Sequence, residues 1–288
     1  MKTLQPKTSF LNFLRRVFFL GPMGEAILLP FTKGKQWNHF AARIPANYYQ
    51  YPKGSIRTVT RNGFKLELDI SDYMQWLLYF GVETEPRKEL YALVKPGMKI
   101  MDVGANIGET AMMFSKLTGP EGKVYAFEPY PSTYHHLFQH LEWNKCTNVT
   151  ALPVALADKE TKLFLGNNPN NTAGNSVSDS GGQEVAVTTG DHFAEAYKTG
   201  KIHFIKIDVE GYEYHVLQGC AQLIKRDRPV LFVEAVDEFL QKQHRSTKEL
   251  VMLLQHYGYT LANAYDGKPI TASDNFSGTH FDIIARPA

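Results

Sequence analysis

The feature that most constrains the fold is an alternation of short apolar runs with helical patterns, which begins at Gly97. Apolar runs at 99–103 and 123–127 are each followed by a stretch with helical periodicity, and the pair recurs further along the chain. This repeat predicts an α/β fold with a mainly parallel, doubly wound sheet and helices on both faces. The last two runs, 259–264 and 281–286, have no helix between them and should pair antiparallel. The other expected strands are 149–154, 203–208 and 230–234, and the expected helices begin after Gly108 and cover 132–143, 213–224 and 247–257.

The chain divides into an expected N-terminal accessory region, 1–90, and an expected main domain, 91–288. Within 56–70, Asn62-Gly63 stands between two alternating segments, which is the strongest short-range signal for a β-hairpin. Between 158 and 190, two strand-like runs are expected to pair as a hairpin, and they flank a polar loop rich in Asn, Ser and Gly that cannot pack a core. A lid over a functional site and a simple insertion are both compatible with this loop.

Residues 9–20 are strongly apolar but carry Arg15 and Arg16 at their centre, which neither a secretory signal nor a spanning helix tolerates. We therefore expect no transmembrane segment. At the helical period Asn12 joins the two arginines on a narrow polar face. The opposite, apolar face consists of Phe10, Phe13, Leu14, Val17 and Leu20. This amphipathic helix is expected to dock on the core or on a second subunit of a homo-oligomer; the alternative is peripheral contact with a membrane.

The 31 Lys and Arg residues are interspersed with 29 Asp and Glu residues, giving a net charge of +2. Proteins that bind nucleic acid mainly through phosphate contacts carry a concentrated basic surplus, so we expect no nucleic-acid partner. The two cysteines, Cys146 and Cys220, are too few for a disulfide framework or a four-thiolate zinc site. This cysteine usage indicates a reducing, cytoplasmic setting.

The most informative stretch is Ile100-Met-Asp-Val-Gly-Ala-Asn-Ile-Gly-Glu-Thr, where an apolar strand leads into a glycine loop that opens a helix. Gly104 and Gly108 allow a sharp turn and a close approach of the backbone to a ligand. The spacing differs from the G-x-G-x-x-G dinucleotide fingerprint, because Asn106 replaces the middle glycine and the last glycine comes one residue early. A nucleoside without phosphate groups therefore fits this loop better.

Glu128 ends the next strand, and its carboxylate can accept hydrogen bonds from both hydroxyls of a ribose. S-adenosylmethionine combines such a ribose with a cationic sulfonium and an amino-acid tail. We expect Asp102 to hold the ammonium of that tail, directly or through water, and the amides of 104–108 to meet its carboxylate. The expected cofactor contacts are Asp102, Gly104, Ala105, Asn106, Gly108, Thr110, Glu128 and Pro129.

Three blocks carry a family resemblance: Asp102-Val-Gly-Ala-Asn-Ile-Gly, Phe127-Glu-Pro-Tyr-Pro, and Phe204-Ile-Lys-Ile-Asp-Val-Glu-Gly-Tyr-Glu with Val216-Leu-Gln-Gly. From about Ile56 onward the chain resembles the FkbM family of S-adenosylmethionine-dependent methyltransferases. The resemblance implies a class I methyltransferase fold, Rossmann-like, with a seven-stranded sheet whose last strand is antiparallel. It also implies methylation of a hydroxyl on a sugar, polyketide or related metabolite. The sequence departs from the family pattern at Thr188-Thr-Gly-Asp, where a Leu-Asp pair is usual, and this departure bears on the substrate.

Methyl transfer from a sulfonium is an in-line displacement, and an alcohol acceptor needs a base to remove its proton. Lys206, Asp208 and Glu210 share one side of the fourth strand if it stays extended, which is unusual for an inner parallel strand. By resemblance Asp208 contacts the cofactor or acceptor, and Glu210 shapes the following turn. Lys206 is expected either among the catalytic groups or as the buried ion-pair partner of Asp208.

Glu234 ends the fifth strand and faces the same crevice. Asp208 and Glu234 are expected to act as base and orienting group; the alternative is that they ligate one divalent cation, but two carboxylates are too few to predict a metal site. His215 is a further candidate base. His136 and His140 have the i, i+4 spacing of metal ligands but lack the HExxH glutamate, so we expect both at the solvated surface.

The resemblance places an N-terminal element over the cofactor, and we expect Glu85 near the cofactor's amino-acid end. The sequence thus predicts an S-adenosylmethionine-dependent O-methyltransferase with a small-molecule or glycan acceptor. The alternative is a catalytically silent member that binds the cofactor or serves as an assembly module.

Overall fold

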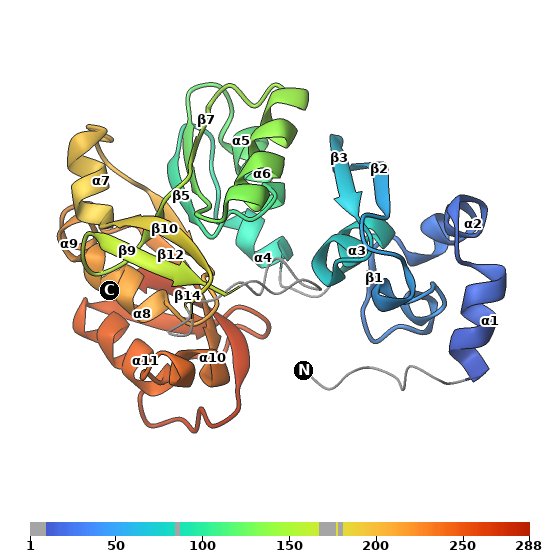
Figure 1. Ribbon diagram of the computed structural model, residues 1–288. Coiled ribbons are helices and arrows are strands. Elements are labelled where there is room, and N and C mark those ends of the chain that lie inside the picture. The colour runs from blue at the N-terminus through green and yellow to red at the C-terminus, as the bar shows by residue number, and fades with distance from the viewer. Residues whose placement is uncertain (1–9, 84–86, 167–176, 178–180) are drawn as a thin grey trace. The chain divides into compact units, whose positions relative to one another are not determined.

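The computed structural model describes residues 10–83, 87–166, 177 and 181–288 (Figure 1). The described residues up to 83 form one compact unit, and those from 87 onward form a second. None of the helices in these ranges combines the length and apolar character needed to cross a bilayer. Glu85 lies outside the described residues, as does most of the polar loop within 158–190, and with them the expected lid.

The N-terminal unit consists of short helices around a two-stranded hairpin. Strands β2 (Ile56–Arg61) and β3 (Phe64–Asp69) pair antiparallel, which confirms the expected hairpin. Asn62 and Gly63, at its turn, have φ angles of 53° and 90°, as a two-residue primed turn requires. The other elements are α1 (Phe10–Phe18), α2 (Pro22–Thr32), β1 (Lys35–Gln36), η1 (Phe40–Arg43), η2 (Tyr48–Gln50), α3 (Tyr73–Phe80) and β4 (Val82–Glu83).

Helix α1 forms where the sequence predicts it, but its faces are reversed. The polar residues Asn12 and Arg15 are each 3% exposed, whereas Phe10 and Phe13 are 75% and 60% exposed. The helix is held by hydrogen bonds from Arg15 Nη1 to Asn12 Oδ1 (2.8 Å) and from Asn12 Nδ2 to the Tyr49 hydroxyl (3.1 Å). The expectation that the apolar face docks on the core is therefore wrong, because a polar network anchors the helix instead.

The second unit is built on a seven-stranded sheet with the order β13-β14-β12-β11-β5-β6-β7. Strands β11, β5, β6, β7 and β12 run parallel, and β14 is antiparallel to both of its neighbours. This arrangement confirms the α/β fold with its antiparallel last strand and the expected pairing of the last two strands. The strands are β5 (Lys99–Val103), β6 (Lys123–Phe127), β7 (Val149–Leu152), β11 (Phe204–Ile207), β12 (Val230–Val236), β13 (Tyr259–Asn263) and β14 (His280–Pro287).

Helices pack against this sheet as the crossovers require (Figure 1). They are α4 (Arg87–Ala92), α5 (Glu109–Thr118), α6 (Pro131–Trp143), α7 (Gly190–Ala196), α8 (Glu213–Gly219), α9 (Ala221–Asp227), α10 (Asp237–Lys242) and α11 (Thr247–His256). The expected single helix over 213–224 is thus two helices. Gly219 ends the first and packs tightly, since a Cβ there would lie 1.8 Å from the carbonyl oxygen of Ala157.

The strand-like runs within 158–190 form part of a smaller, three-stranded sheet. Strands β9 (Thr161–Leu165) and β10 (Gln183–Thr188) pair antiparallel, as expected, and β8 (Ala155–Leu156) adds a parallel partner to β10. The main core lies on one face of the large sheet, where Val103, Ile205 and Ile207 are fully or nearly fully buried. Because side chains alternate along a strand, Asp102 and Lys206 lie on the other face.

Candidate functional site

The glycine loop connects β5 to α5 at the carboxyl edge of the sheet. Gly104 has a φ of 81°, and a Cβ there would lie 1.9 Å from the carbonyl oxygen of Asp208, so only glycine fits. Gly108 has a φ of 94°, and its Cβ would lie 2.6 Å from Leu137 Cδ1 on α6. Gly104 and Asn106 are partly exposed, while Ala105 is buried. The two glycines therefore let β5, β11 and α6 converge beneath a loop that a ligand can reach.

The loop's amides already donate hydrogen bonds within the protein. The amides of Gly104 and Ala105 donate to Phe127 O, and that of Gly108 donates to Ala105 O. The Ile107 amide donates to Asn106 Oδ1 at 2.8 Å, and the Asn106 amide donates to Glu128 at 3.0 Å. The expectation that these amides meet a cofactor carboxylate stays a prediction. The loop offers shape and close backbone approach rather than free N–H groups.

Glu128 follows β6 and lies against the glycine loop. Its Oε2 accepts from the Asn106 amide and its Oε1 from the Tyr130 amide, both at 3.0 Å. Burial raises the pKa of Glu128 to about 7, and the two backbone hydrogen bonds act against this rise. Each oxygen keeps capacity for a further donor, so Glu128 can hold a ligand hydroxyl. Pro129, the next residue, is half-buried.

Lys206 is a buried cation beneath the loop. Its Nζ lies 3.0 Å from Asp208 Oδ2, 3.6 Å from Asp102 Oδ1, and 3.1 Å from the carbonyl oxygen of Gly104. The strand register sets Lys206 beside Asp102 on the neighbouring strand. Its expected role as the ion-pair partner of Asp208 is confirmed by these distances. Lys206 thereby ties the ends of β5 and β11 together.

Asp102 is fully buried and accepts a hydrogen bond from the Thr110 hydroxyl at 2.7 Å. Burial raises its pKa, and the nearby charge of Lys206 opposes that rise. No part of Asp102 reaches the surface, and its expected contact with a cofactor ammonium, directly or through water, stays a prediction. Asp102 and Thr110 instead brace the loop from below.

The turn after β11 departs from an extended strand. Glu210 has a φ of 55°, so the expected alternation of Lys206, Asp208 and Glu210 ends at Asp208. Glu213 Oε1 accepts hydrogen bonds from the amides of Val209 (3.1 Å) and Gly211 (3.0 Å) and so holds this turn. Burial raises the pKa of Glu210 to about 8 and that of Glu213 to about 7.

Sequence reasoning missed His280, at the start of β14. Its Nε2 lies 3.3 Å from Glu234 Oε1, and the antiparallel register puts Asp282 directly opposite Glu234. Burial raises the pKa of Glu234 well above its usual range, and the charges of Asp208 and Glu210 raise it further. Burial lowers the pKa of His280, while the charge of Asp208 acts in the opposite direction. Asp208, Glu234 and His280 therefore interact electrostatically at one edge of the sheet.

The other histidines lie elsewhere. His215 Nδ1 is 3.7 Å from Asp158 Oδ1, and its ring stacks on Tyr212. His140 is fully buried, and its Nδ1 lies 2.8 Å from the carbonyl oxygen of Ile107 in the glycine loop. Its expected place at the surface is thus wrong, because α6 packs against that loop. Within the described ranges, no group of three His, Cys, Asp or Glu side chains is arranged to hold a metal ion.

The sequence profile of the methyltransferase FkbM domain matches residues 102–261, which is more than half of the chain. The chain belongs to the FkbM methyltransferase family. The matched region runs from the glycine loop through β13, so it includes Glu128, Lys206, Asp208 and Glu234.

This FkbM methyltransferase is similar to several proteins with which it shares less than a third of the aligned residues. It is 29% identical to the hexuronic acid methyltransferase AglP of Haloferax volcanii over 129 residues, 44% of this chain and about half (51%) of that protein. The crystal structure of the FkbM methyltransferase from Methylobacillus flagellatus KT gives a TM-score of 0.44 at 18% identity, over 74% of this chain and 55% of that one. Aeropyrum pernix fibrillarin, solved with bound S-adenosyl-L-methionine, gives 0.40 at 17% identity, over 82% and 84% of the two chains.

Proposed function

We propose that this FkbM methyltransferase transfers a methyl group from S-adenosylmethionine to a hydroxyl on a glycan sugar or a related small molecule. The observation that carries the proposal is a convergence at one edge of the sheet. The glycine loop follows β5, Glu128 follows β6 and Asp208 follows β11. Glu234, two residues before the end of β12 and not at its end as expected, pairs with His280 at the start of β14. Ligands of open α/β sheets bind at this edge.

The residues at the loop fit the adenosyl part of the cofactor. Glu128 is fixed by two backbone amides and keeps acceptor capacity for the two ribose hydroxyls. The loop glycines bring the backbone close enough for the ribose to reach this carboxylate. S-adenosylmethionine, when bound, supplies an electrophilic methyl carbon on a sulfonium.

The second group of residues suits the removal of a proton from the acceptor. We place the neutral ring of His280, whose Nε2 lies 3.3 Å from Glu234 Oε1, as the base that takes the hydroxyl proton while the methyl–oxygen bond forms. A lowered pKa keeps His280 neutral near pH 7, which is the form a base needs. Asp208, held by Lys206, orients the acceptor.

The similarity to AglP, whose name specifies a hexuronic acid, supports the proposed acceptor class. A sugar hydroxyl is a weak acid, so its methylation needs the kind of base that His280 and Glu234 provide. We therefore propose a glycan sugar, with a uronic acid as the first acceptor to test.

The test is an acceptor panel incubated with the full chain and S-adenosylmethionine, scored by release of S-adenosylhomocysteine. The panel pairs a methyl glucuronide with the matched methyl glucoside, and adds a polyketide alcohol. We expect turnover with at least one sugar and a product that survives mild base, because an ether resists hydrolysis and a methyl ester does not. If no acceptor is turned over, or if the only product is base-labile, the proposed methylation of a hydroxyl is contradicted.

A further inference from the structure

The outer surfaces of α1 and α2 are apolar although both helices are already packed. On α1, Phe10, Phe13 and Val17 are 75%, 60% and 57% exposed. On α2, Met23, Ile27 and Phe31 are 85%, 61% and 62% exposed. We call these six side chains the apolar outer surface. Exposed large apolar side chains gathered on two neighbouring helices are typical of an interaction site.

Both helices are held in place by polar side chains on their inner faces. The anchor of α1 is the network of Asn12 and Arg15 described above. The anchor of α2 is Glu25, which is fully buried and accepts hydrogen bonds from Arg57 (2.8 and 3.0 Å) and from the Tyr79 hydroxyl (3.1 Å). The faces of α1 and α2 that pack on the unit are thus held by specific polar contacts. The apolar outer surface is exposed although both helices are already packed.

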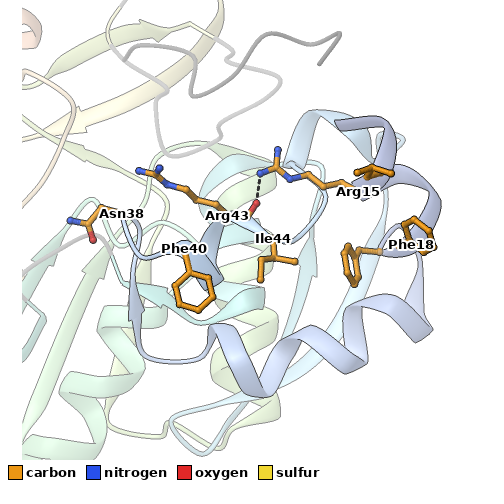
Figure 2. Close-up of a pocket in the computed structure, with 8 residues that line it drawn as sticks. Arg15, Phe18, Asn38, Phe40, Arg43 and Ile44 are labelled. Carbon is orange, nitrogen blue, oxygen red and sulfur yellow. Dashed lines mark hydrogen bonds between the residues drawn. The ribbon is translucent and has the colours of Figure 1, made fainter. Parts of the chain in front are cut away.

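The two helices meet closely at their junction. A Cβ on Gly24 would lie 2.7 Å from Phe19 Cα, so the start of α2 packs directly on the end of α1. Next to this junction lies an open cavity of about 510 Å³, whose lining includes Phe18, Phe40 and Ile44. Figure 2 shows the guanidinium groups of Arg15 and Arg43 along one edge of this cavity and the apolar side chains below them. The cavity thus combines apolar walls with a cationic edge.

The segment that carries this surface is basic. Residues 1–50 contain seven Lys or Arg and one acid, Glu25, whereas residues 51–288 contain 24 Lys or Arg and 28 acids. Glu25 is buried, so the exposed charges among residues 10–50 are all basic: Arg16, Lys33, Lys35 and Arg43. Exposed apolar side chains flanked by basic residues match the chemistry of an anionic lipid surface.

We propose that the N-terminal unit docks on an anionic phospholipid bilayer through the apolar outer surface of α1 and α2. Phe10, Phe13, Met23, Ile27 and Phe31 enter the boundary between headgroups and acyl chains, and the flanking basic residues meet the lipid phosphates. A second copy of the chain fits less well as the occupant. A two-fold interface would bring the same basic residues, Arg16, Lys33, Lys35 and Arg43, of both copies together, and the exposed Glu83 offsets only part of that charge.

The experiment is flotation of the full chain with vesicles of phosphatidylglycerol mixed with phosphatidylcholine, compared with vesicles of phosphatidylcholine alone. We expect binding to the anionic vesicles and little to the neutral ones. The double variant Phe13→Ser/Ile27→Ser should bind at least about tenfold less. The matched control is Phe138→Ser, which removes an exposed phenylalanine (50%) from α6 in the other unit and should bind as the wild type does.

Three results would overturn the proposal. One is the absence of vesicle binding, and another is equal binding to both vesicle types. The third is a lipid-free dimer, seen by light scattering, that Phe13→Ser/Ile27→Ser dissociates, because the surface would then cover a second copy. Unchanged thermal unfolding of each variant shows that a loss of binding reflects the surface and not the fold.

Discussion

Three side chains at the ends of β11, β12 and β14 determine the chemistry that we propose. Glu234 alone would be a poor base for a sugar hydroxyl, because its burial beside Asp208 and Glu210 favours the protonated carboxyl group. His280 changes this, since its Nε2 lies 3.3 Å from Glu234 and its lowered pKa keeps the ring neutral. The neutral ring of His280 can therefore take a proton where the protonated Glu234 cannot.

This pairing predicts the pH dependence of catalysis. Protonated His280 cannot act as a base, and burial lowers its pKa below the usual value of about 6.5. We expect kcat/KM to fall with decreasing pH in a limb centred below about 6.5. His280→Gln should lower kcat by roughly 10²-fold or more and remove that limb. The measurement is the pH profile of S-adenosylhomocysteine release with the best acceptor.

The matched control for this variant is His256→Gln, which removes an exposed histidine near the end of α11. It should retain both the rate and the acid limb. If His280→Gln kept a wild-type profile, the base would have to be another group, and His280 would have no part in the chemistry.

At the scale of elements, the glycine loop depends on close backbone packing. Gly104→Ala adds a methyl group 1.9 Å from the carbonyl oxygen of Asp208, in a backbone conformation that alanine disfavours. We expect the free energy of unfolding to fall by about 2 kcal/mol or more, measured by urea denaturation. Gly97→Ala is the control, because Gly97 has a similar φ of 78° with nothing within 4 Å of its Cβ. Gly97→Ala should lower the free energy of unfolding by only about 1 kcal/mol. Equal decreases for both variants would show that the contact with Asp208 is unimportant.

The sequence predicts most elements because their signals are local. Strands at 99–103 and 123–127 and the Asn62-Gly63 hairpin occur where periodicity and turn chemistry place them. The orientation of α1 is not local. It depends on hydrogen bonds from Asn12 to the Tyr49 hydroxyl and from Arg15 to the carbonyl oxygen of Arg43. The periodicity of the helix sequence does not indicate such distant partners.

In the candidate site, too, the sequence predicts what local patterns determine but not what contacts between distant residues determine. Asp208, Glu234 and Glu128 stand at strand ends, so an alternating βα pattern is enough to bring them to one edge of the sheet. His280 belongs to no motif, and its position beside Glu234 follows from the antiparallel register of β12 and β14. The buried setting of Asp102 likewise depends on Lys206, which lies on a strand about a hundred positions away in the sequence.

For the whole molecule, charge is divided between the two parts of the chain. The near balance of 31 basic and 29 acidic residues conceals a basic N-terminal segment, residues 1–50, and a remainder in which acids outnumber bases. The acids of the second unit include those that end the sheet strands, where a sulfonium cofactor is proposed to bind. The bases of residues 1–50 lie in the same segment as the proposed lipid surface. Catalysis and docking are thus assigned to separate units, so each can be tested without the other.

The most direct test of the central claim is calorimetric titration of the full chain with S-adenosylhomocysteine. We expect the wild type to bind, and Glu128→Gln to bind roughly tenfold to a hundredfold more weakly, because it loses charge-assisted hydrogen bonds to the ribose. Glu121→Gln, at an exposed glutamate shortly before β6, should bind as the wild type does. Absence of binding by the wild type at millimolar ligand, or equal affinity in all three proteins, would contradict the account.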